Sequence, residues 1–350
     1  MADTGDVTPV RDAHKFDENR LADYMQAHVD GFKGPLSVEQ FEGGQSNPTF
    51  LLRTPDQEYV MRKKPPGNLL PSAHAVDREY RVMSALQETD VPVARTYALC
   101  EDPEVIGTAF YIMEKVAGRV LRKPELPGMD PAERSAIYDA MNDTLAKMHN
   151  VDIDAVGLGD FGKKGNYFER QIGRWTKQYR ASETETIPTM EKLIEWLPEN
   201  MPTKLENTIC HGDYRLENMI IHPTKPEVVA VLDWELCTIG HPLADLAYNC
   251  MTYHFMHPSA GGLVTTNFKE SGIPSEEEYI AAYCRRTGRD GIEKWPFYIA
   301  FSFFRLAAIV QGVYKRGLDG NASSEKAKTY GTFARMLADL GAKNILLAEK

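Results

Sequence analysis

Three polar residues between positions 209 and 235 keep a spacing that suits chemistry on phosphate groups. Asp213 is followed five positions later by Asn218, and Asp233 comes fifteen positions after that. A carboxylate can accept the proton of an attacking hydroxyl, and a second carboxylate with an amide oxygen can hold Mg²⁺ against nucleotide phosphates. The spacing therefore predicts phosphoryl transfer, with Asp213 as the proton acceptor and with Asn218 and Asp233 as metal ligands.

Two short apolar runs, 219–221 and 228–232, predict the elements that position these residues. They are joined by a link that contains two prolines and several charges, which is typical of a turn. We expect a loop that carries Asp213 and Asn218, then a β-hairpin, with Asp233 at the end of its second strand.

The motifs around this hairpin are those of a known protein family. The loop reads His-Gly-Asp at 211–213, the second strand ends in Asp-Trp-Glu at 233–235, and GHPLADLA follows at 240–247. Protein kinases keep the same spacing from catalytic aspartate to asparagine, followed by a metal-binding aspartate. The chain thus resembles the aminoglycoside phosphotransferase family. That resemblance implies an α+β, bilobal protein-kinase-like fold, with a small antiparallel-sheet N-lobe at 1–115 and a larger, mainly helical C-lobe at 116–350.

The expected N-lobe carries the candidate nucleotide-binding residues. A glycine-containing turn between two predicted strands would let backbone N–H groups approach phosphate at Gly44, Ser46 and Asn47. By resemblance, Arg62 stands where better-known members of the family have a phosphate-binding lysine. Glu79, on the following helix, is its implied partner.

Lys63 follows Arg62 directly and competes with it for the phosphates. Alternation along a strand points the two side chains to opposite faces, so we favour Arg62 for the nucleotide. Lys63 and Lys64 are then either a basic rim that contacts the substrate or an ordinary solvated charge run.

The expected hinge between the lobes follows an apolar strand at 109–113. The resemblance implies that the backbone of Glu114 and Val116 receives the nucleotide base. Backbone recognition leaves no side-chain signature, so the sequence leaves ATP and GTP open. The implied cofactors are one of these nucleotides and Mg²⁺, bound between the lobes.

His211 and Arg215 flank Asp213 in the catalytic loop and are counted with it as catalytic-site residues. His211 is expected to brace the loop. The resemblance implies that Asp245, within the GHPLADLA run, also supports the loop by accepting hydrogen bonds from its backbone.

Candidate substrate contacts come from two places. Arg170 and Arg174 are four apart on a predicted helix and therefore share a face, which could hold an anionic group of the substrate. The alternative is a surface helix with solvated arginines. Trp234 and Glu235, beside the second aspartate of the motif, are further candidates.

Longer runs narrow the resemblance to one subgroup. FEGGQSNPTF, VMRKKPPGNLLPSAHAVDREYRVM and the segment from HGDYRLENMIIHP to GHPLADLAY are similar to kinase domains fused to acyl-CoA dehydrogenases in animals, and to stand-alone bacterial relatives. The implied activity is phosphorylation of the hydroxyl of 4-hydroxyacyl-CoA thioesters during their catabolism, in functional pairing with an acyl-CoA dehydrogenase. Two alternatives stay open: a kinase for another small alcohol or an aminoglycoside, and a non-catalytic nucleotide-binding regulator.

The composition argues against other classes of protein. The 350-residue chain has a formal net charge of −10, whereas nucleic-acid binding needs a basic face. We expect no signal peptide in the polar, acid-rich start, and no membrane span in the apolar stretch 298–310, which is short and interrupted by Arg305. If buried, Arg305 should need an anionic partner. Five scattered cysteines fit reduced thiols and a cytoplasmic location.

Hydrophobic periodicity and capping signals predict the other elements. Strands are expected at 36–41, 49–53, 58–62 and 109–113. Helices are expected at 16–32, 73–88, 131–149, 166–179, from 240 onward, 275–286, 295–315 and 323–347.

Overall fold

The computed structural model describes residues 7–42, 47–65, 74–257, 260–320, 327 and 329–348. The chain folds into two compact units that interleave in sequence. Unit 1 comprises Met1–Leu121, Asp154–Leu158 and Leu216–Cys237. Unit 2 comprises Arg122–Ile153, Gly159–Arg215 and Thr238–Lys350. The lobes expected at 1–115 and 116–350 stay a prediction, and the units differ from them chiefly because the hairpin segment groups with unit 1.

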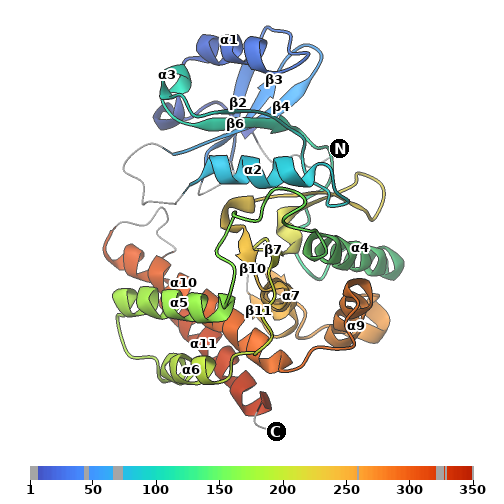
Figure 1. Cartoon of the computed structure of the whole chain (residues 1–350), viewed down its shortest axis with the longest axis vertical. Coiled ribbons are helices and arrows are strands. Elements are labelled where there is room, and N and C mark those ends of the chain that lie inside the picture. The colour runs from blue at the N-terminus through green and yellow to red at the C-terminus, as the bar shows by residue number, and fades with distance from the viewer. Residues whose placement is uncertain are drawn as a thin grey trace. The chain divides into compact units, whose positions relative to one another are not determined.

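Unit 1 is built on a six-stranded sheet whose hydrogen-bonded neighbours all run antiparallel (Figure 1). Its spatial order is β1 (Val7–Thr8), β2 (Ser37–Phe41), β3 (Thr49–Arg53), β4 (Glu58–Lys63), β6 (Phe110–Glu114) and β5 (Thr96–Cys100). One face carries α1 (Glu18–His28) and the other carries α2 (Val76–Leu86). Short helices η1 (Asp12–His14) and α3 (Pro103–Ile106) complete this part.

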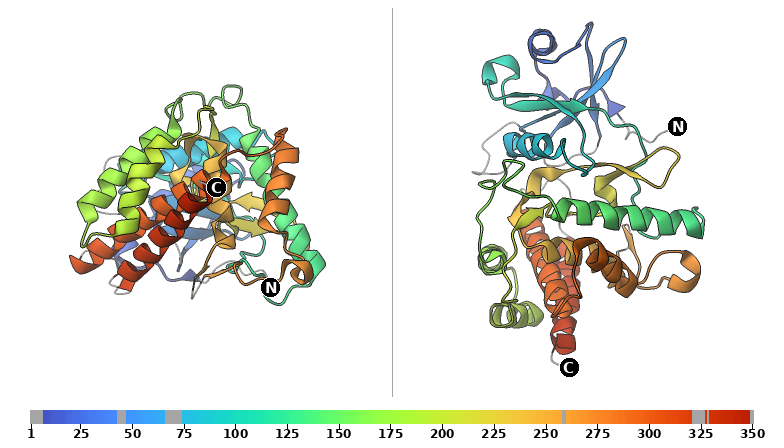
Figure 2. Two further views of the ribbon diagram at one scale, coloured as in Figure 1. Left: turned by 90° about the horizontal axis from the view of Figure 1, so that it is seen from below. Right: turned by 45° about the vertical axis from the view of Figure 1, so that its right-hand side comes forward.

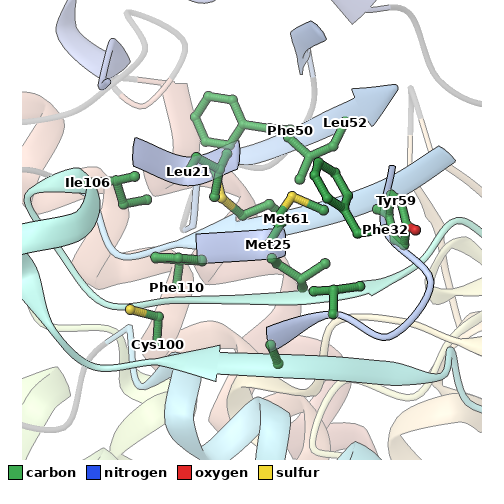
Figure 3. Close-up of a cluster of buried hydrophobic side chains, with 13 residues drawn as sticks. Leu21, Met25, Phe32, Phe50, Leu52, Tyr59, Met61, Cys100, Ile106 and Phe110 are labelled. Atoms are coloured by element: carbon green, nitrogen blue, oxygen red, sulfur yellow. The ribbon is translucent and has the colours of Figure 1, made fainter. Parts of the chain in front are cut away.

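The core of unit 1 lies between α1 and the sheet (Figure 3). Helix α1 begins after Asp17, whose side chain accepts from the backbone N–H groups of Asn19 and Arg20. Its buried residues Leu21 and Met25 pack with apolar side chains that alternate along the strands. Because side chains alternate along a strand, this packing leaves every second residue of β4 to face α2.

A second hairpin in unit 1 is formed by β8 (Met219–Ile221) and β9 (Val228–Val231). Short 3₁₀ helices precede and follow it, η2 (Leu216–Asn218) and η3 (Trp234–Leu236). At Gly118 a Cβ would lie 2.4 Å from the Ile221 carbonyl oxygen, so only glycine allows that approach.

Unit 2 is mainly helical, and α10 lies along α11 (Figures 1 and 2). Its helices are α4 (Pro131–His149), α5 (Tyr167–Ser182), α6 (Pro188–Glu199), α7 (Pro242–Cys250), η4 (Met251–Tyr253), α8 (Phe268–Ser271), α9 (Glu276–Thr287), α10 (Trp295–Leu318) and α11 (Tyr330–Ala348). Two small strand pairs, β7 (Thr208–Cys210) with β10 (Thr238–Gly240) and β11 (Met256–His257) with β12 (Gly261–Gly262), complete it.

Most predicted elements are observed within a few residues of their expected bounds. The cap of α4 by Asp130 and the capping box of α9 between Ser275 and Glu278 are present as predicted. By length and composition alone, α10 could cross a membrane, but 72% of its most apolar window is buried inside the fold. No other helix in the described ranges meets that test.

Candidate active site

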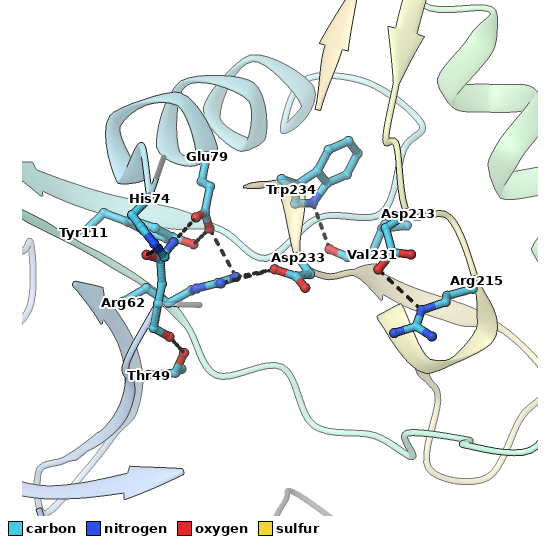
Figure 4. A network of polar contacts seen from close by, with 11 residues as sticks. Thr49, Arg62, His74, Glu79, Tyr111, Asp213, Arg215, Val231, Asp233 and Trp234 are labelled. Carbon is cyan, nitrogen blue, oxygen red and sulfur yellow. Dashed lines mark hydrogen bonds and ion pairs between the residues drawn. The ribbon is translucent and has the colours of Figure 1, made fainter. Parts of the chain in front are cut away.

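In unit 1, Arg62 bridges two carboxylates (Figure 4). Its Nη1 lies 3.1 Å from Glu79 Oε2, and both Nη1 and Nη2 donate to Asp233 Oδ1 at 3.2 Å. Burial alone would lower the pKa of Arg62, but Glu79, then Tyr111 and Asp233, outweigh that effect and raise it. Arg62 is therefore a fixed cation, held between the helix glutamate and the predicted metal ligand.

Glu79 is almost fully buried and is oriented by two further donors. The Tyr111 hydroxyl donates to Oε2 at 2.9 Å, and the Asn47 amide donates to Oε1 at 2.6 Å. Burial raises the pKa of Glu79, while Arg62 and these donors oppose the rise. Because the carboxylate is held from several sides, it fixes the position of Arg62.

Asn218 and Asp233 meet at one end of the β8–β9 hairpin. Met219 pairs with Val231, and the Leu232 N–H donates to the Asn218 carbonyl oxygen at 2.8 Å. Asp233 then adopts a left-handed conformation, with φ 64° and ψ 58°, that is uncommon outside glycine. A strained backbone at a motif aspartate is typical of a functional position.

The donor set at this hairpin end fits Mg²⁺, which prefers oxygen ligands. Asp233 is about one-third exposed, and only its Oδ1 is engaged by Arg62 within the described part of the chain. The residues that would hold the ion are Asp233 through its carboxylate and Asn218 through its amide oxygen.

In unit 2, Asp245 holds the loop that carries Asp213, as predicted. Its carboxylate accepts from the backbone N–H of His211 at 2.5 Å and from that of Gly212 at 2.9 Å. The Asp213 N–H donates to His211 Nδ1 at 3.2 Å, so His211 braces the loop from within. Gly212 has φ 84°, a conformation that favours glycine in this turn.

Two side chains contact the Asp213 carboxylate itself. Arg215 Nε lies 3.4 Å from Oδ2 (Figure 4), and the Tyr248 hydroxyl donates to Oδ1 at 2.7 Å. Burial raises the pKa of Tyr248, and the charge of Asp213 adds to that rise, so the phenol stays protonated and remains a donor. The carboxylate is therefore oriented on both oxygens.

Sequence reasoning missed Tyr248 and the contact of His149 with Asp245. Tyr248 lies three residues after Asp245 on α7, and this helical spacing is the signal that places both on one face. His149 ends α4, with Nδ1 2.7 Å from the Tyr283 hydroxyl and Nε2 3.6 Å from Asp245 Oδ2. Burial lowers the pKa of His149, so it is a neutral neighbour of the aspartate.

Arg305 corrects another expectation. The residue is buried on α10, but the expected anionic partner is missing: no carboxylate among the described residues pairs with it. Its Nη2 donates to the Gly212 carbonyl oxygen at 2.7 Å, and its guanidinium carbon lies 5.3 Å and 5.9 Å from the ring centres of Tyr248 and Trp175. A backbone dipole and two aromatic rings take the place of the expected anion.

Lys63 lies on the opposite strand face from Arg62, as alternation predicts. It is only 4% exposed, and its Nζ lies 5.5 Å and 5.7 Å from the ring centres of Phe16 and Phe50. Burial lowers its pKa. Lys63 therefore belongs to the α1 side of the sheet and is not part of a solvent-exposed basic rim.

Two more predicted contacts are buried in other roles. Asn47 is fully buried, with its amide between Glu79 and His74, so it supports Glu79 and presents no exposed surface to a nucleotide. Trp234 is 2% exposed and its indole N–H donates to the Val231 carbonyl oxygen at 3.0 Å, which makes it a packing residue of the hairpin.

The remaining candidates are accessible to different extents. Arg174 is exposed, and its guanidinium lies 5.3 Å from the Trp175 ring centre, while Arg170 is half-buried and donates to the Lys163 carbonyl oxygen. Glu235 is half-buried and contributes to the raised pKa of Arg62.

The predicted hinge is only partly accessible to a base. The Glu114 N–H is taken by the Arg95 carbonyl oxygen, whereas no hydrogen bond is formed by the Val116 backbone within the described ranges. Gly44 and Ser46 lie outside the described residues.

Comparison with known proteins identifies the family. Residues 37–296 match the phosphotransferase enzyme family. The chain belongs to this family. The predicted protein-kinase-like α+β fold, with a small antiparallel sheet and a larger helical part, is thereby confirmed.

The chain is also similar to parts of larger proteins. Acyl-CoA dehydrogenase family member 10 of Mus musculus is 49% identical over 335 residues, which cover 95% of this chain and 31% of that protein. Acyl-CoA dehydrogenase family member 11 of Homo sapiens is 45% identical over 343 residues, which cover 96% of this chain and 44% of that protein. The chain therefore spans less than half the length of these relatives.

Solved structures agree on the fold. A crystal structure from Ralstonia eutropha, named as a candidate aminoglycoside phosphotransferase, is 55% identical with a TM-score of 0.88 and covers 94% of this chain and 98% of its own. A variant of aminoglycoside phosphotransferase APH(4)-Ia in complex with ADP and hygromycin B is 15% identical, with a TM-score of 0.62 and coverage of 94% and 98%. At that identity the likeness concerns the fold alone.

Proposed function

We propose that the protein transfers the γ-phosphoryl group of ATP, with Mg²⁺, to the hydroxyl of a small molecule, and that the acceptor is a 4-hydroxyacyl-CoA thioester. The observation that carries the proposal is the Arg62 bridge between Glu79 and Asp233. A buried cation fixed beside a metal-binding carboxylate is the arrangement that phosphoryl transfer needs on the nucleotide side.

Each group has a defined task in this proposal. Arg62 neutralises nucleotide phosphate charge, and Glu79 holds Arg62 in place. Asn218 and Asp233 hold Mg²⁺, which would supply charge neutralisation at the phosphates when bound. Neighbouring solved structures with ADP or AMP-PNP support an adenine nucleotide.

The proton and bond changes balance around Asp213. The acceptor oxygen forms a bond to the γ-phosphorus while the bond from that phosphorus to the ADP oxygen breaks. The hydroxyl proton moves to the Asp213 carboxylate, which Tyr248 and Arg215 orient. Asp213 belongs to unit 2, whereas Arg62, Asn218 and Asp233 belong to unit 1.

The choice of acceptor rests on the relatives. Both mammalian relatives are named as acyl-CoA dehydrogenase family members, and this chain matches a minor part of each. A kinase segment joined to an acyl-CoA dehydrogenase suggests that the kinase prepares a hydroxylated acyl-CoA for that second enzyme. Pairing with such an enzyme, and a cytoplasmic location, are part of the proposal.

An acceptor panel tests the proposal. ADP release with Mg-ATP would be measured against 4-hydroxyacyl-CoAs, the free 4-hydroxy acids, choline, homoserine and an aminoglycoside. Turnover confined to the thioesters is the expected result. Turnover on another acceptor would keep the kinase and reject the acyl-CoA assignment. Mg-ATP binding without turnover on a widened panel would favour a non-catalytic regulator.

A further inference from the structure

Arg305 carries a buried charge that the protein does not neutralise. The residue is 7% exposed, and no carboxylate among the described residues forms an ion pair with it. Buried charges are normally paired, because desolvation of an isolated ion is costly. One guanidinium donor, Nη2, is used by the Gly212 carbonyl oxygen. The other N–H groups of the guanidinium have no protein partner in the described ranges. They are not among the fully buried nitrogens without a hydrogen bond, so they reach solvent.

The surroundings of this cation include Asp213. Gly212, whose carbonyl Arg305 binds, directly precedes Asp213 in the loop. Tyr248 lies under the guanidinium at 5.3 Å and donates to Asp213 at 2.7 Å. Arg305 therefore stands next to the carboxylate that must meet the acceptor hydroxyl.

Two cations already lie over the ring of Trp175. The Arg305 guanidinium lies 5.9 Å from the Trp175 ring centre, and the Arg174 guanidinium lies 5.3 Å from it. The ring quadrupole attracts cations, but any further cation that approached this ring would also meet the two positive charges already beside it. The Trp175 ring is therefore a poor site for the ammonium group of a substrate.

We propose that Arg305 is the acceptor-recognition residue, binding a carbonyl or carboxylate oxygen close to the reacting hydroxyl, and that the Arg305–Trp175–Arg174 group excludes cationic acceptors. The inference rests on the proposed function, because it assumes that the acceptor binds at Asp213. It names the ligand class as neutral or anionic hydroxy compounds with an oxygen-rich group. Quaternary ammonium alcohols and aminoglycosides fall outside that class.

Binding of three probes with one carbon skeleton tests this inference. 4-Hydroxypentanoate, 4-hydroxypentanamide and (4-hydroxypentyl)trimethylammonium would be titrated calorimetrically into the full chain with Mg²⁺ and AMP-PNP. We expect the carboxylate to bind at least about 10-fold more tightly than the ammonium, with the amide between them. Equal affinities, absence of binding by all three, or tightest binding of the ammonium would overturn the inference.

Variants assign the discrimination to Arg305. Arg305→Met removes the charge with similar volume and should bring the affinity ratio close to one. Arg305→Lys keeps the charge and should retain most of the ratio. If Arg305→Met does not fold, the order of the three affinities in wild type and the affinity ratio of Arg305→Lys test the inference. A ratio that survives in folded Arg305→Met contradicts the role of Arg305.

A second pair of variants lies on exposed positions. Arg174→Gln should reduce the ratio, whereas Lys192→Gln, the same change of charge on α6, should leave it unchanged. If both substitutions change the affinity ratio equally, the ratio depends on the overall charge of the protein, and selection by the groups around Trp175 is contradicted. ADP release is measured separately with the same probes. If turnover is absent but the order of affinities is as expected, the proposed function is rejected and the ligand class is kept. If turnover is present but the order of affinities is not as expected, only this inference is rejected.

Discussion

The hydroxyl of Tyr248 donates a hydrogen bond of 2.7 Å to Asp213 Oδ1. The phenol itself is kept protonated by its raised pKa, and it lies under the Arg305 guanidinium. The rotation of the proposed base is therefore set by a residue of α7, which also carries the aspartate that holds the loop backbone. Helix α7 therefore positions both the proposed base and the loop that carries it.

Tyr248→Phe should lower kcat without changing nucleotide affinity. The change removes only the donor to Asp213, and a hydrogen bond to a charged group is worth about 1.5–3 kcal/mol, or about 10- to 100-fold in rate. Tyr253→Phe is the matched control, because its hydroxyl donates to the Pro274 carbonyl oxygen and not to Asp213. Equal rates for wild type and Tyr248→Phe would remove Tyr248 from the orientation of the base.

Arg62 and Lys63 should behave oppositely when each is replaced by methionine. Arg62→Met should raise the KM for ATP at least about 10-fold, because it removes the cation between Glu79 and Asp233. Lys63→Met should leave that KM unchanged, because Lys63 packs against Phe16 and Phe50. A larger effect at Lys63 than at Arg62 would contradict this assignment, because it would place the phosphates on the Lys63 face of β4.

Asp233→Asn should weaken Mg²⁺ use. An amide in place of the carboxylate removes a negative charge from the proposed metal site and from the ion pair with Arg62. We expect the Mg²⁺ concentration for half-maximal rate to rise about 10-fold or more. Asp56→Asn, the same substitution at an exposed position between β3 and β4, is the control for a general loss of negative charge. If that control shifts the Mg²⁺ dependence as far as Asp233→Asn does, Asp233 is not the specific ligand.

His241 should make the fold sensitive to acid. Burial is the main cause that lowers the pKa of His241 from 6.5 to about 4. In the folded state the imidazole stays neutral, whereas in the unfolded chain it binds a proton below pH 6.5, so stability falls as the pH drops from there towards 4. At pH 5 this group alone should cost about 2 kcal/mol.

His241→Asn separates this titration from the helix cap. His241 Nδ1 accepts from the Leu243 N–H at the start of α7, and asparagine can also cap without titrating. The free energy of unfolding would be compared at pH 7.5 and pH 5 by chemical denaturation. The variant should lose less stability than wild type over this interval, and an equal loss would contradict the assignment.

Local signals in the sequence predicted most helices and strands and the positions of several candidate site residues. The cap residues Asp130 and Ser275 fixed helix starts, because capping depends on neighbours in the chain. Alternation along β4 separated Arg62 from Lys63 for the same reason. The support of the catalytic loop by Asp245 came through the family resemblance and is seen in its two backbone hydrogen bonds.

Contacts between distant segments could not be predicted in this way. Arg305 is 93 residues from Gly212, and nothing in the apolar run around it indicated that its partner would be a carbonyl oxygen. Trp234 follows a motif residue and appeared accessible in the sequence, but tertiary packing buries it. The grouping of the hairpin with the N-terminal sheet also depends on packing that no local pattern records.

The most direct test of the central claim is phosphoryl transfer by wild type and Asp213→Asn side by side. Radiolabelled γ-phosphate from Mg-ATP would be followed onto a 4-hydroxyacyl-CoA, with Mg-ATP binding measured on the same preparations. We predict label on the acceptor hydroxyl with wild type, a rate at least about 100-fold lower with Asp213→Asn, and equal nucleotide affinity for both. Equal rates for the two proteins, or no label on any hydroxylated acceptor with wild type, would contradict the account.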